Sequence, residues 1–279
     1  MVVFMRNSVF VFCLSLLLCA CQPKGDLVLL CTNDTHSQVE VCGANMKKMS
    51  GLGGYAYRAG LIDSLRNENP ELLLLDAGDF SQGTPYFNLY RGRVEILAYN
   101  QMRYDAVTLG NHEFDNGVDT LAARLREASF EVVCTNYAVE GTPLEGIVKK
   151  SVVFERAGWK VGVIGLGVNP DGLILKSNFG GVRYLNPLEV ANAYADSLKH
   201  RCDCDAVILL SHLSSSYDDE NTIPSDEYIA QNSHSIDVIV GGHTHKQVEK
   251  KCVNLDGDSV LLVQTGKSGA YLGKIKLRK

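Results

Sequence analysis

The sequence lacks an excess of positive charge. Its 279 residues include 27 lysines and arginines against 32 aspartates and glutamates, which gives a formal net charge of −5. A protein that binds a nucleic-acid polymer needs a basic surface to neutralise phosphates, so the composition argues against such a partner. Internal repeats and low-complexity tracts are also absent, and 46% of the residues are hydrophobic. That share is enough for a sizeable buried core, which excludes a largely disordered chain.

The first twenty residues contain no hydrophobic run long enough to cross a bilayer. The apolar run at 9–18 follows the positive charge of Arg6 and is far shorter than the roughly 20 residues of a spanning helix. A basic start followed by a short apolar stretch is typical of a secretory signal. Residues 1–20 are therefore predicted to be a signal peptide that directs export.

The end of that segment, LCAC at 18–21, resembles a bacterial lipobox. The resemblance implies that Cys21 carries a lipid anchor and that residues 21–25 form a tether. Gln22 follows the cysteine where an inner-membrane protein would have Asp. We therefore expect an exported periplasmic lipoprotein, anchored to the outer membrane by buried acyl chains. The alternative is an ordinary signal peptide with an accidental cysteine.

Cysteine pairs at the spacing of a structural zinc site are absent. Cys202 and Cys204 form the one close pair beyond residue 21, and no second pair accompanies it, so a short turn is favoured over a metal or redox motif. Cys31 and Cys134 lie in apolar runs and are expected to be buried thiols. An exported protein can form disulfides, but the spacing of its cysteines does not choose among the pairings.

Short apolar runs alternate with amphipathic stretches of helix length along the remaining chain. Continuous apolar runs are typical of strands buried on both faces, and such runs lie at 27–31, 72–75, 106–109, 161–166, 206–210 and 238–240. Two further strands are expected at 260–263 and 271–277. Helices are expected at 55–66, at 118–128, and from the cap signal Asn-Pro-Leu-Glu at 186–189. This alternation predicts a layered α/β fold in a single domain at 26–279.

Five of the expected strands end in polar residues of the same few types. In open α/β sheets, ligands bind beyond the carboxyl ends of the strands. The segments at these ends are Asn33-Asp34-Thr35-His36, Asp76-Ala77-Gly78-Asp79, Gly110-Asn111-His112-Glu113-Phe114-Asp115, Ser211-His212 and Gly241-Gly242-His243-Thr244-His245. His200 and His234 lie outside these segments and are expected to be ordinary surface or loop residues.

Carboxylates and imidazoles gathered at one edge of a sheet are energetically unfavourable unless something binds them. Unpaired, they would repel one another and lose hydration, whereas divalent cations bind both types of group. Asp-x-His and His-x-His spacings place two side chains on the same side of an extended segment. Seven or eight candidates exceed the about four to six ligands that one ion takes. The segments therefore predict two ions that share a bridging carboxylate.

The same segments resemble the motifs of the calcineurin-like metallophosphoesterases. The segments 32–36, 110–115 and 241–245 are closest to those of the N-terminal catalytic domain of exported bacterial 5′-nucleotidases and 2′,3′-cyclic phosphodiesterases. The resemblance covers 26–279, and it implies a four-layer α/β/β/α sandwich. It also implies two divalent metal ions, with Mn, Zn, Fe and Co all compatible with the mixed oxygen and nitrogen donors.

The resemblance assigns a role to individual residues of this sequence. The first ion would be held by Asp34, His36, Asp79 and His245. The second ion would be held by Asp79, Asn111, His212 and His243, so that Asp79 bridges the two. His112 would face the phosphoryl group without binding metal, and Asp115 would orient its ring. Asp76 has no role in the family and is expected to be structural.

The function implied by the resemblance is hydrolysis of a small phosphate ester by metal-activated water. A 5′-nucleotidase-like reaction on a phosphomonoester is favoured, and the alternative is a 2′,3′-cyclic or other phosphodiester substrate. The family's C-terminal nucleotide-binding domain is not recognised in this sequence. A second alternative is therefore a lipid-anchored metal-binding protein that needs a separate protein carrying that domain. Tyr86, Phe87 and Tyr90 are read as loop packing rather than as a local stacking wall for a base.

Overall fold

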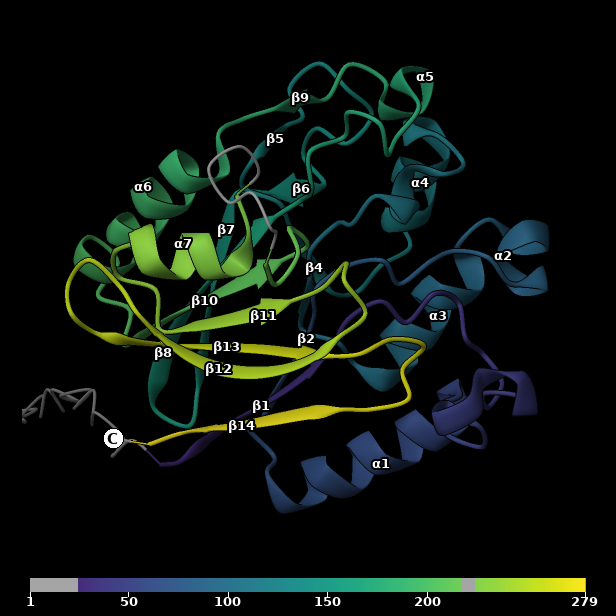
Figure 1. Cartoon of the computed structure of the whole chain (residues 1–279), viewed down its shortest axis with the longest axis horizontal. Helices are drawn as coiled ribbons and strands as arrows, with labels where there is room; N and C mark the ends of the chain where they lie inside the picture. Colours follow the sequence, from purple (N-terminus) through teal and green to yellow (C-terminus); the bar gives the residue numbers. More distant parts are fainter. Residues whose placement is uncertain (1–24, 217–223, 279) are drawn as a thin grey trace, which may run out of the picture.

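The computed structural model describes residues 25–216 and 224–278. Two six-stranded sheets form the centre of the molecule (Figure 1). The first has the order β14-β1-β2-β3-β4-β6, with bounds Gly273–Leu277, Leu27–Thr32, Leu73–Asp76, Ala106–Val107, Glu131–Val133 and Val148–Lys149. The second has the order β12-β13-β11-β10-β8-β7, with bounds Gln247–Val253, Ser259–Thr265, Val238–Gly241, Ala206–Ser211, Trp159–Leu166 and Ser151–Arg156. The predicted signal peptide and Cys21 lie outside the described residues.

Most neighbouring strands in both sheets run parallel. The antiparallel pairs are β1 with β14, β12 with β13 and β7 with β8. A separate two-stranded ribbon joins β5 (Tyr137–Ala138) to β9 (Arg183–Tyr184). Because the inner strands are parallel, β1, β2 and β3 end at one edge of the first sheet, and β8, β10 and β11 end together in the second.

Helices cover the outer faces of the two sheets. The α-helices are α1 (Tyr55–Glu68), α2 (Pro85–Tyr90), α3 (Arg93–Met102), α4 (Val118–Leu125), α5 (Lys176–Phe179), α6 (Pro187–His200) and α7 (Asp226–Asn232). Two 3₁₀ helices, η1 (Ala44–Met49) and η2 (His112–Phe114), complete the described elements. Within the described ranges, none of the helices has both the length and the apolar character that crossing a bilayer demands.

Three buried clusters of hydrophobic residues separate four layers, which confirms the predicted sandwich. Strand β1 shows how alternation builds them. Leu27 and Leu29 face the second sheet, whereas Val28 and Leu30 face the cluster that contains Ile62 of α1. The third cluster lies between the second sheet and helices α6 and α7. The continuous apolar runs are thus explained by burial on both faces of each sheet.

The expected helices and strands are found with shifted ends. The Asn186 side chain accepts hydrogen bonds from the backbone N–H groups of Leu188 and Glu189, as the cap signal predicted for α6. Helix α4 ends at Leu125 rather than at 128. The edge strands β7 and β12 were not expected, because their exposed outer faces interrupt the apolar pattern.

The cysteines of the described residues are all free thiols. Cys31 and Cys134 are fully buried, as expected from their apolar surroundings. Burial raises the pKa of the Cys31 and Cys134 thiols to about 12, so both stay protonated and unreactive at neutral pH. Cys202 and Cys204 follow α6 in a turn and form no disulfide.

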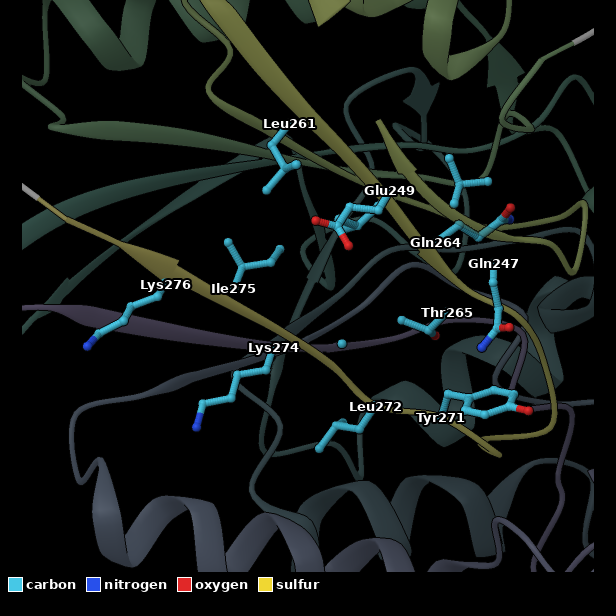
Figure 2. A pocket seen from close by; sticks show the side chains of 13 residues that line it. Gln247, Glu249, Leu261, Gln264, Thr265, Tyr271, Leu272, Lys274, Ile275 and Lys276 are labelled. Carbon is cyan, nitrogen blue, oxygen red and sulfur yellow. The ribbon is translucent and has the colours of Figure 1, made fainter. Parts of the chain in front are cut away.

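The edge of the molecule formed by β12, β13 and β14 contains a groove of about 590 Å³ (Figure 2). Aliphatic side chains such as Leu261 and Ile275 lie at its base, and the charged groups of Glu249, Lys274 and Lys276 stand along it. None of the expected metal ligands lines this groove. The centre predicted from the sequence therefore lies elsewhere in the described structure.

Asp76 occupies a buried position at the end of β2, in agreement with a structural role. Its carboxylate accepts hydrogen bonds from Thr32 Oγ1 (2.5 Å), Tyr99 OH (3.0 Å) and the Gly78 N–H (2.9 Å). Burial is the largest influence on this group and raises the pKa of Asp76 to about 7. The folded protein therefore keeps a proton that the unfolded chain releases near pH 3.8.

This difference predicts a pH-dependent effect of Asp76→Asn on stability. Between about pH 4 and pH 7, unfolding releases the Asp76 proton, so rising pH favours the unfolded wild type. The free energy of unfolding of the wild type, relative to that of Asp76→Asn, is expected to fall across this window. Urea unfolding of both proteins across this pH range, in chelator-containing buffer, measures the difference in their free energies of unfolding. Parallel pH curves for the two proteins would show that Asp76 is ionised in the fold.

Candidate metal centre

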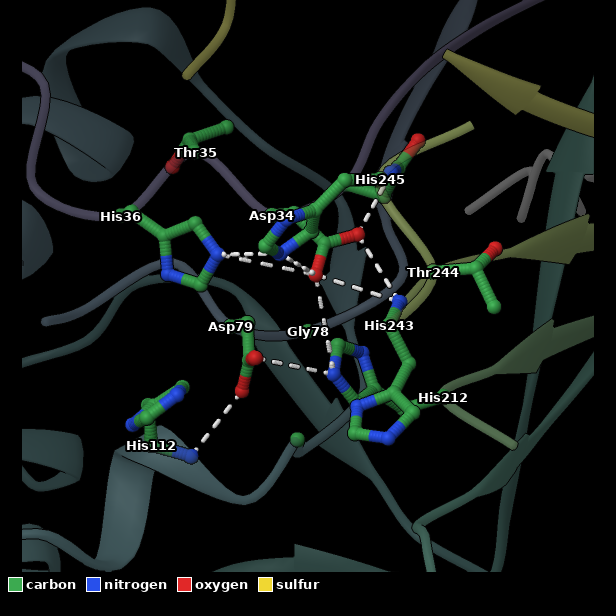
Figure 3. Close-up of polar contacts among 12 residues, drawn as sticks. Asp34, Thr35, His36, Gly78, Asp79, His112, His212, His243, Thr244 and His245 are labelled. Atoms are coloured by element: carbon green, nitrogen blue, oxygen red, sulfur yellow. Dashed lines mark hydrogen bonds and ion pairs between the residues drawn. The ribbon is translucent and has the colours of Figure 1, made fainter. Parts of the chain in front are cut away.

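The carboxyl edges of the two sheets meet, and the expected ligands gather there (Figure 3). One group, the Asp34 group, consists of Asp34, His36 and His245. The other, the Asp79 group, consists of Asp79, His212 and His243. In each group the ligand atoms lie within 4.8 Å of one another. Each group combines residues that follow strands of the first sheet with residues that follow strands of the second, so neither sheet alone could form the centre.

The Asp34 group brings two imidazoles and a carboxylate to one point. Nε2 of His36 lies 2.9 Å from Nε2 of His245, and Asp34 Oδ1 lies 3.7 Å and 3.4 Å from these two nitrogens. Burial lowers the pKa of His36 to about 4, so this ring is neutral at physiological pH. Imidazole nitrogens directed at a shared point with a carboxylate oxygen form a set of donors suited to a transition-metal ion.

The Asp79 group is deeper in the protein. His212 Nε2 lies 3.0 Å from Asp79 Oδ2 and 3.8 Å from Asp34 Oδ1, while His212 Nδ1 lies 2.7 Å from the backbone oxygen of Ala77. A ring nitrogen that donates to a backbone carbonyl leaves the other nitrogen directed at the ligand point, as is usual for metal-binding histidines.

Charge is strongly concentrated in the Asp79 group. Burial disfavours a charged His212, but Asp79 and Asp34 outweigh burial and raise the pKa of His212 to about 10. Burial likewise disfavours the Asp79 carboxylate, but His212 outweighs it and lowers the pKa of Asp79 below its usual range. The site thus stabilises positive charge beside two aspartates. A divalent cation would take the place of the proton on His212, because metal binding requires a neutral imidazole.

Asn111 completes the expected set and supplies the clearest test of whether these residues fit a metal. Its side chain is buried, yet its Oδ1 atom accepts no hydrogen bond within the described ranges. Leaving a buried amide oxygen unpaired costs about 1–3 kcal/mol, and a cation would remove that cost. The residues present therefore fit a centre of two cations with oxygen and nitrogen donors.

Backbone strain accompanies the ligands. Five of the seven expected ligands have φ angles between 44° and 71°, a region that favours glycine: Asp34, His36, Asp79, His243 and His245. Each such residue costs about 1–3 kcal/mol, and it persists only where its surroundings hold it. Hydrogen bonds between the loops supply that restraint, from the Asp34 N–H to the Gly78 oxygen (2.9 Å) and from the His36 N–H to the Asp79 oxygen (3.0 Å).

Gly110 permits the close approach of two loops in the centre. A Cβ atom at this position would lie 2.1 Å from Asp79 Oδ1, which is far inside any allowed contact. The neighbouring His112 N–H donates to the same Asp79 oxygen at 3.0 Å. The turn after β3 therefore lies directly against the carboxylate that is expected to bridge the ions.

His112 and Asp115 form a pair beside the centre. Nδ1 of His112 lies 2.9 Å from Asp115 Oδ2, and the ring centroids of His112 and His36 are 5.6 Å apart. The His112 side chain is 28% exposed, so its outer face is open to a ligand from solution. Burial lowers the pKa of His112, but the hydrogen bond to Asp115 and the charge of Asp79 outweigh burial and raise that pKa above its usual value. The pair is therefore suited to hold and deliver a proton.

Several residues that support the centre were not singled out by the sequence. Asn33 donates to Asp34 Oδ2 (2.6 Å) and accepts from Thr265 N–H and Oγ1, so it holds Asp34 against β13. Asp226 is fully buried and accepts a hydrogen bond from Ser211 Oγ, next to His212. Asn33 lay inside a recognised segment, but Asp226 lies in a polar stretch that carries no signal.

Other residues considered from the sequence lie outside both groups. His200 is exposed, and His234 pairs with Asp256 at 2.7 Å. Phe87 is buried in α2, and the Tyr86 hydroxyl donates a hydrogen bond to the Glu40 carboxylate. In the described structure these residues do not contribute donor atoms to the metal centre.

The family model of the calcineurin-like phosphoesterases matches residues 27–247. The chain belongs to that family. The motif-based identification is thereby confirmed. The family is dinuclear and metal-dependent, and the described structure has two candidate ligand groups.

This calcineurin-like phosphoesterase resembles several characterised proteins. A snake venom 5′-nucleotidase of Crotalus adamanteus is 32% identical over 90% of the chain and 45% of its own length. A solved 5′-nucleotidase precursor of Thermus thermophilus has a TM-score of 0.80 and 31% identity, over 91% of this chain and 51% of that one. The calcineurin-like phosphoesterase YfkN of Bacillus subtilis has a TM-score of 0.73 and 26% identity, over 92% and 86% respectively. The chain thus spans about half the length of the two 5′-nucleotidases.

Proposed function

We propose that this phosphoesterase hydrolyses phosphomonoesters of nucleosides, with two divalent cations held by the Asp34 and Asp79 groups. The observation that carries the proposal is the position of the partly exposed His112–Asp115 pair directly beside both groups. The names of the similar 5′-nucleotidases support a nucleotide substrate. Mn, Zn, Fe and Co all suit the mixed donors.

The proposed ligand roles are those implied by the resemblance, and the Asp34 and Asp79 groups support them. Asp34, His36 and His245 would hold the first ion, and Asp79 would contribute to both. His212, His243 and Asn111 would complete the second site. When bound, the two cations would polarise the phosphoryl oxygens and supply a nucleophile by lowering the pKa of water.

His112 would supply the proton that the leaving group needs. The Asp115 carboxylate accepts a hydrogen bond from Nδ1 of His112. When His112 is protonated, its Nε2 atom also carries a hydrogen, which is available to a substrate beside this partly exposed ring. The raised pKa of His112 keeps a larger fraction of the ring protonated near neutral pH than an isolated imidazole would have. The pair would thus act as a general acid toward the alkoxide oxygen of the ester.

Recognition of the nucleoside and location in the cell complete the proposal. The matched region spans about half the length of the matched 5′-nucleotidases, and base recognition is proposed to need residues beyond that region. Export and a lipid anchor on Cys21 are proposed from the pattern of residues 1–21 alone. Metabolic labelling with a fatty acid, with Cys21→Ser as the control, tests the anchor.

A substrate screen on metal-reconstituted protein tests the function. Apo protein is supplied with Mn²⁺, Co²⁺ or Zn²⁺ and assayed for phosphate release from 5′-AMP and a chromogenic monoester. Assays of 2′,3′-cyclic AMP and a bis-ester run in parallel. We expect turnover of the monoesters that disappears when the protein is treated with a chelator. Preference for the cyclic or bis-ester would overturn the monoester assignment. Folded protein that binds two ions and turns over none of the four compounds would support a metal-binding protein that depends on a partner.

A further inference from the structure

Glu113 lies between the two loops of the centre without belonging to either ligand group. It is part of η2, and its side chain is 4% exposed. On one side lies the turn that follows β2 and carries Asp79. On the other side lies the turn that follows β3 and carries Asn111 and His112. A buried acid at this point needs an explanation, because burial and the nearby Asp79 both raise its pKa and disfavour a negative charge there.

Both oxygens of Glu113 are fully used as hydrogen-bond acceptors. Oε2 accepts from the backbone N–H groups of Asp79 (2.9 Å) and Gly110 (2.7 Å). Oε1 accepts from the Ser81 N–H (3.1 Å) and the Ser81 hydroxyl (3.1 Å). Three of these four donors are backbone amides in turns, where no strand or helix provides a partner.

The acid group of Glu113 satisfies all four donors. A carboxylate offers acceptors on both oxygens, whereas the amide of glutamine replaces one oxygen with an NH₂ group that can only donate. The contacts also join two turns whose strands are neighbours in the first sheet. One carboxylate therefore sets the relative position of the turn at 79–81 and the turn at 110–113.

The joined turns contain the most demanding geometry of the centre. Asp79 has a left-handed backbone (φ 55°), and Glu113 holds its amide in that orientation. Asp79 Oδ1 in turn accepts from the His112 N–H and would lie 2.1 Å from a Cβ at Gly110. A shift of either turn would move the Asp79 carboxylate relative to both Asn111 and His112.

We propose that Glu113 is a positioning residue that fixes the bridging carboxylate of Asp79 against the turn that carries Asn111 and His112. It acts through backbone amides and contacts neither the metal ions nor the substrate. Its effect on catalysis rests on the proposed function, whereas its effect on metal affinity does not. Loss of a residue that orients a metal ligand typically weakens metal binding 10–100-fold.

Glu113→Gln tests the proposal because it keeps the shape of the side chain and places an NH₂ group against an N–H donor. Calorimetric titration of the apo protein with Mn²⁺ or Zn²⁺ is expected to show dissociation constants raised about 10–100-fold. Leu198→Ala is the matched control. It removes a buried side chain from α6 in another layer, so it lowers the thermal midpoint while metal affinity stays that of the wild type. Wild-type affinity in Glu113→Gln would overturn the proposal.

A measurement on the wild type keeps the proposal testable if the variant does not fold. The amide protons of Asp79 and Gly110 in the apo protein are expected to exchange with deuterium far more slowly than those of exposed turns. Exchange at the rate of exposed turns would contradict the role of Glu113. A wild type that binds two ions but hydrolyses no ester, with binding weakened in Glu113→Gln, would refute the proposed function and leave this inference standing.

Discussion

Asp79→Ala is expected to abolish the binding of both cations and, with them, all hydrolysis above background. Asp79 Oδ2 lies 3.0 Å from His212 Nε2, and Oδ1 lies against the turn of Gly110 and His112. One oxygen of the Asp79 carboxylate therefore faces His212, and the other faces the turn that contains Asn111. Its removal leaves the second site with neutral donors alone, and it takes from the pair of ions the negative charge that reduces their mutual repulsion.

Elemental analysis of purified, metal-loaded protein measures the effect. The wild type is expected to retain two ions per chain and Asp79→Ala none. Asp63→Ala is a suitable control, since Asp63 is an exposed aspartate on α1 that pairs with Arg103 at 3.3 Å. Full retention of two ions by Asp79→Ala would show that Asp79 does not bridge. Retention of one ion would assign Asp79 to a single site, with Asp34 as the remaining carboxylate of the centre.

His112→Ala is expected to lower kcat by 10²-fold or more while both ions remain bound. A general acid contributes about 10²–10⁴-fold, and His112 lies outside both ligand groups. Its pKa is raised because Asp115 and Asp79 stabilise the imidazolium against the effect of burial. The acid function is therefore complete below that pKa and is lost as pH rises through it.

The pH profile of kcat separates this role from a structural one. The wild type is expected to lose activity on the alkaline side, with a midpoint above the ordinary histidine value, and His112→Ala to lack that limb. Asp115→Asn removes the charge that raises the pKa, so its midpoint is expected at lower pH. His234→Ala is the matched control, because His234 forms a similar pair with Asp256 at the surface. Equal loss of metal and activity in His112→Ala would make His112 a ligand instead.

The sequence predicted the layers of the fold because burial on two faces leaves a strong local pattern. Continuous apolar runs identified β1, β8, β10 and β11, and the capping signal at Asn186 located the start of α6. The same criterion missed β7 and β12, whose outer faces are exposed. Their pairing depends on the neighbouring strand rather than on any pattern of their own.

The residues that hold the metal ligands in place were not predicted from the sequence. Glu113 stood inside a recognised segment, yet nothing in the segment shows that its carboxylate accepts backbone amides from a turn more than 30 residues earlier. Asp226 lies in a stretch with no apolar period and no motif. The sequence likewise does not predict the left-handed backbone of Asp79 and His243, because these residue types adopt it only where their surroundings restrain them.

The sequence by itself determined which side-chain types stand at the strand ends, and hence that divalent cations suit them, whereas the phosphate ester was implied by the resemblance of these segments to a family. Only the tertiary structure decided which of them meet. His36 and His245 are 209 positions apart, and their ring nitrogens come within 2.9 Å because the carboxyl edges of two separate sheets face each other. Local patterns report burial and turns, whereas the order of strands in a sheet and the packing of one sheet on another are set by contacts summed over the whole chain.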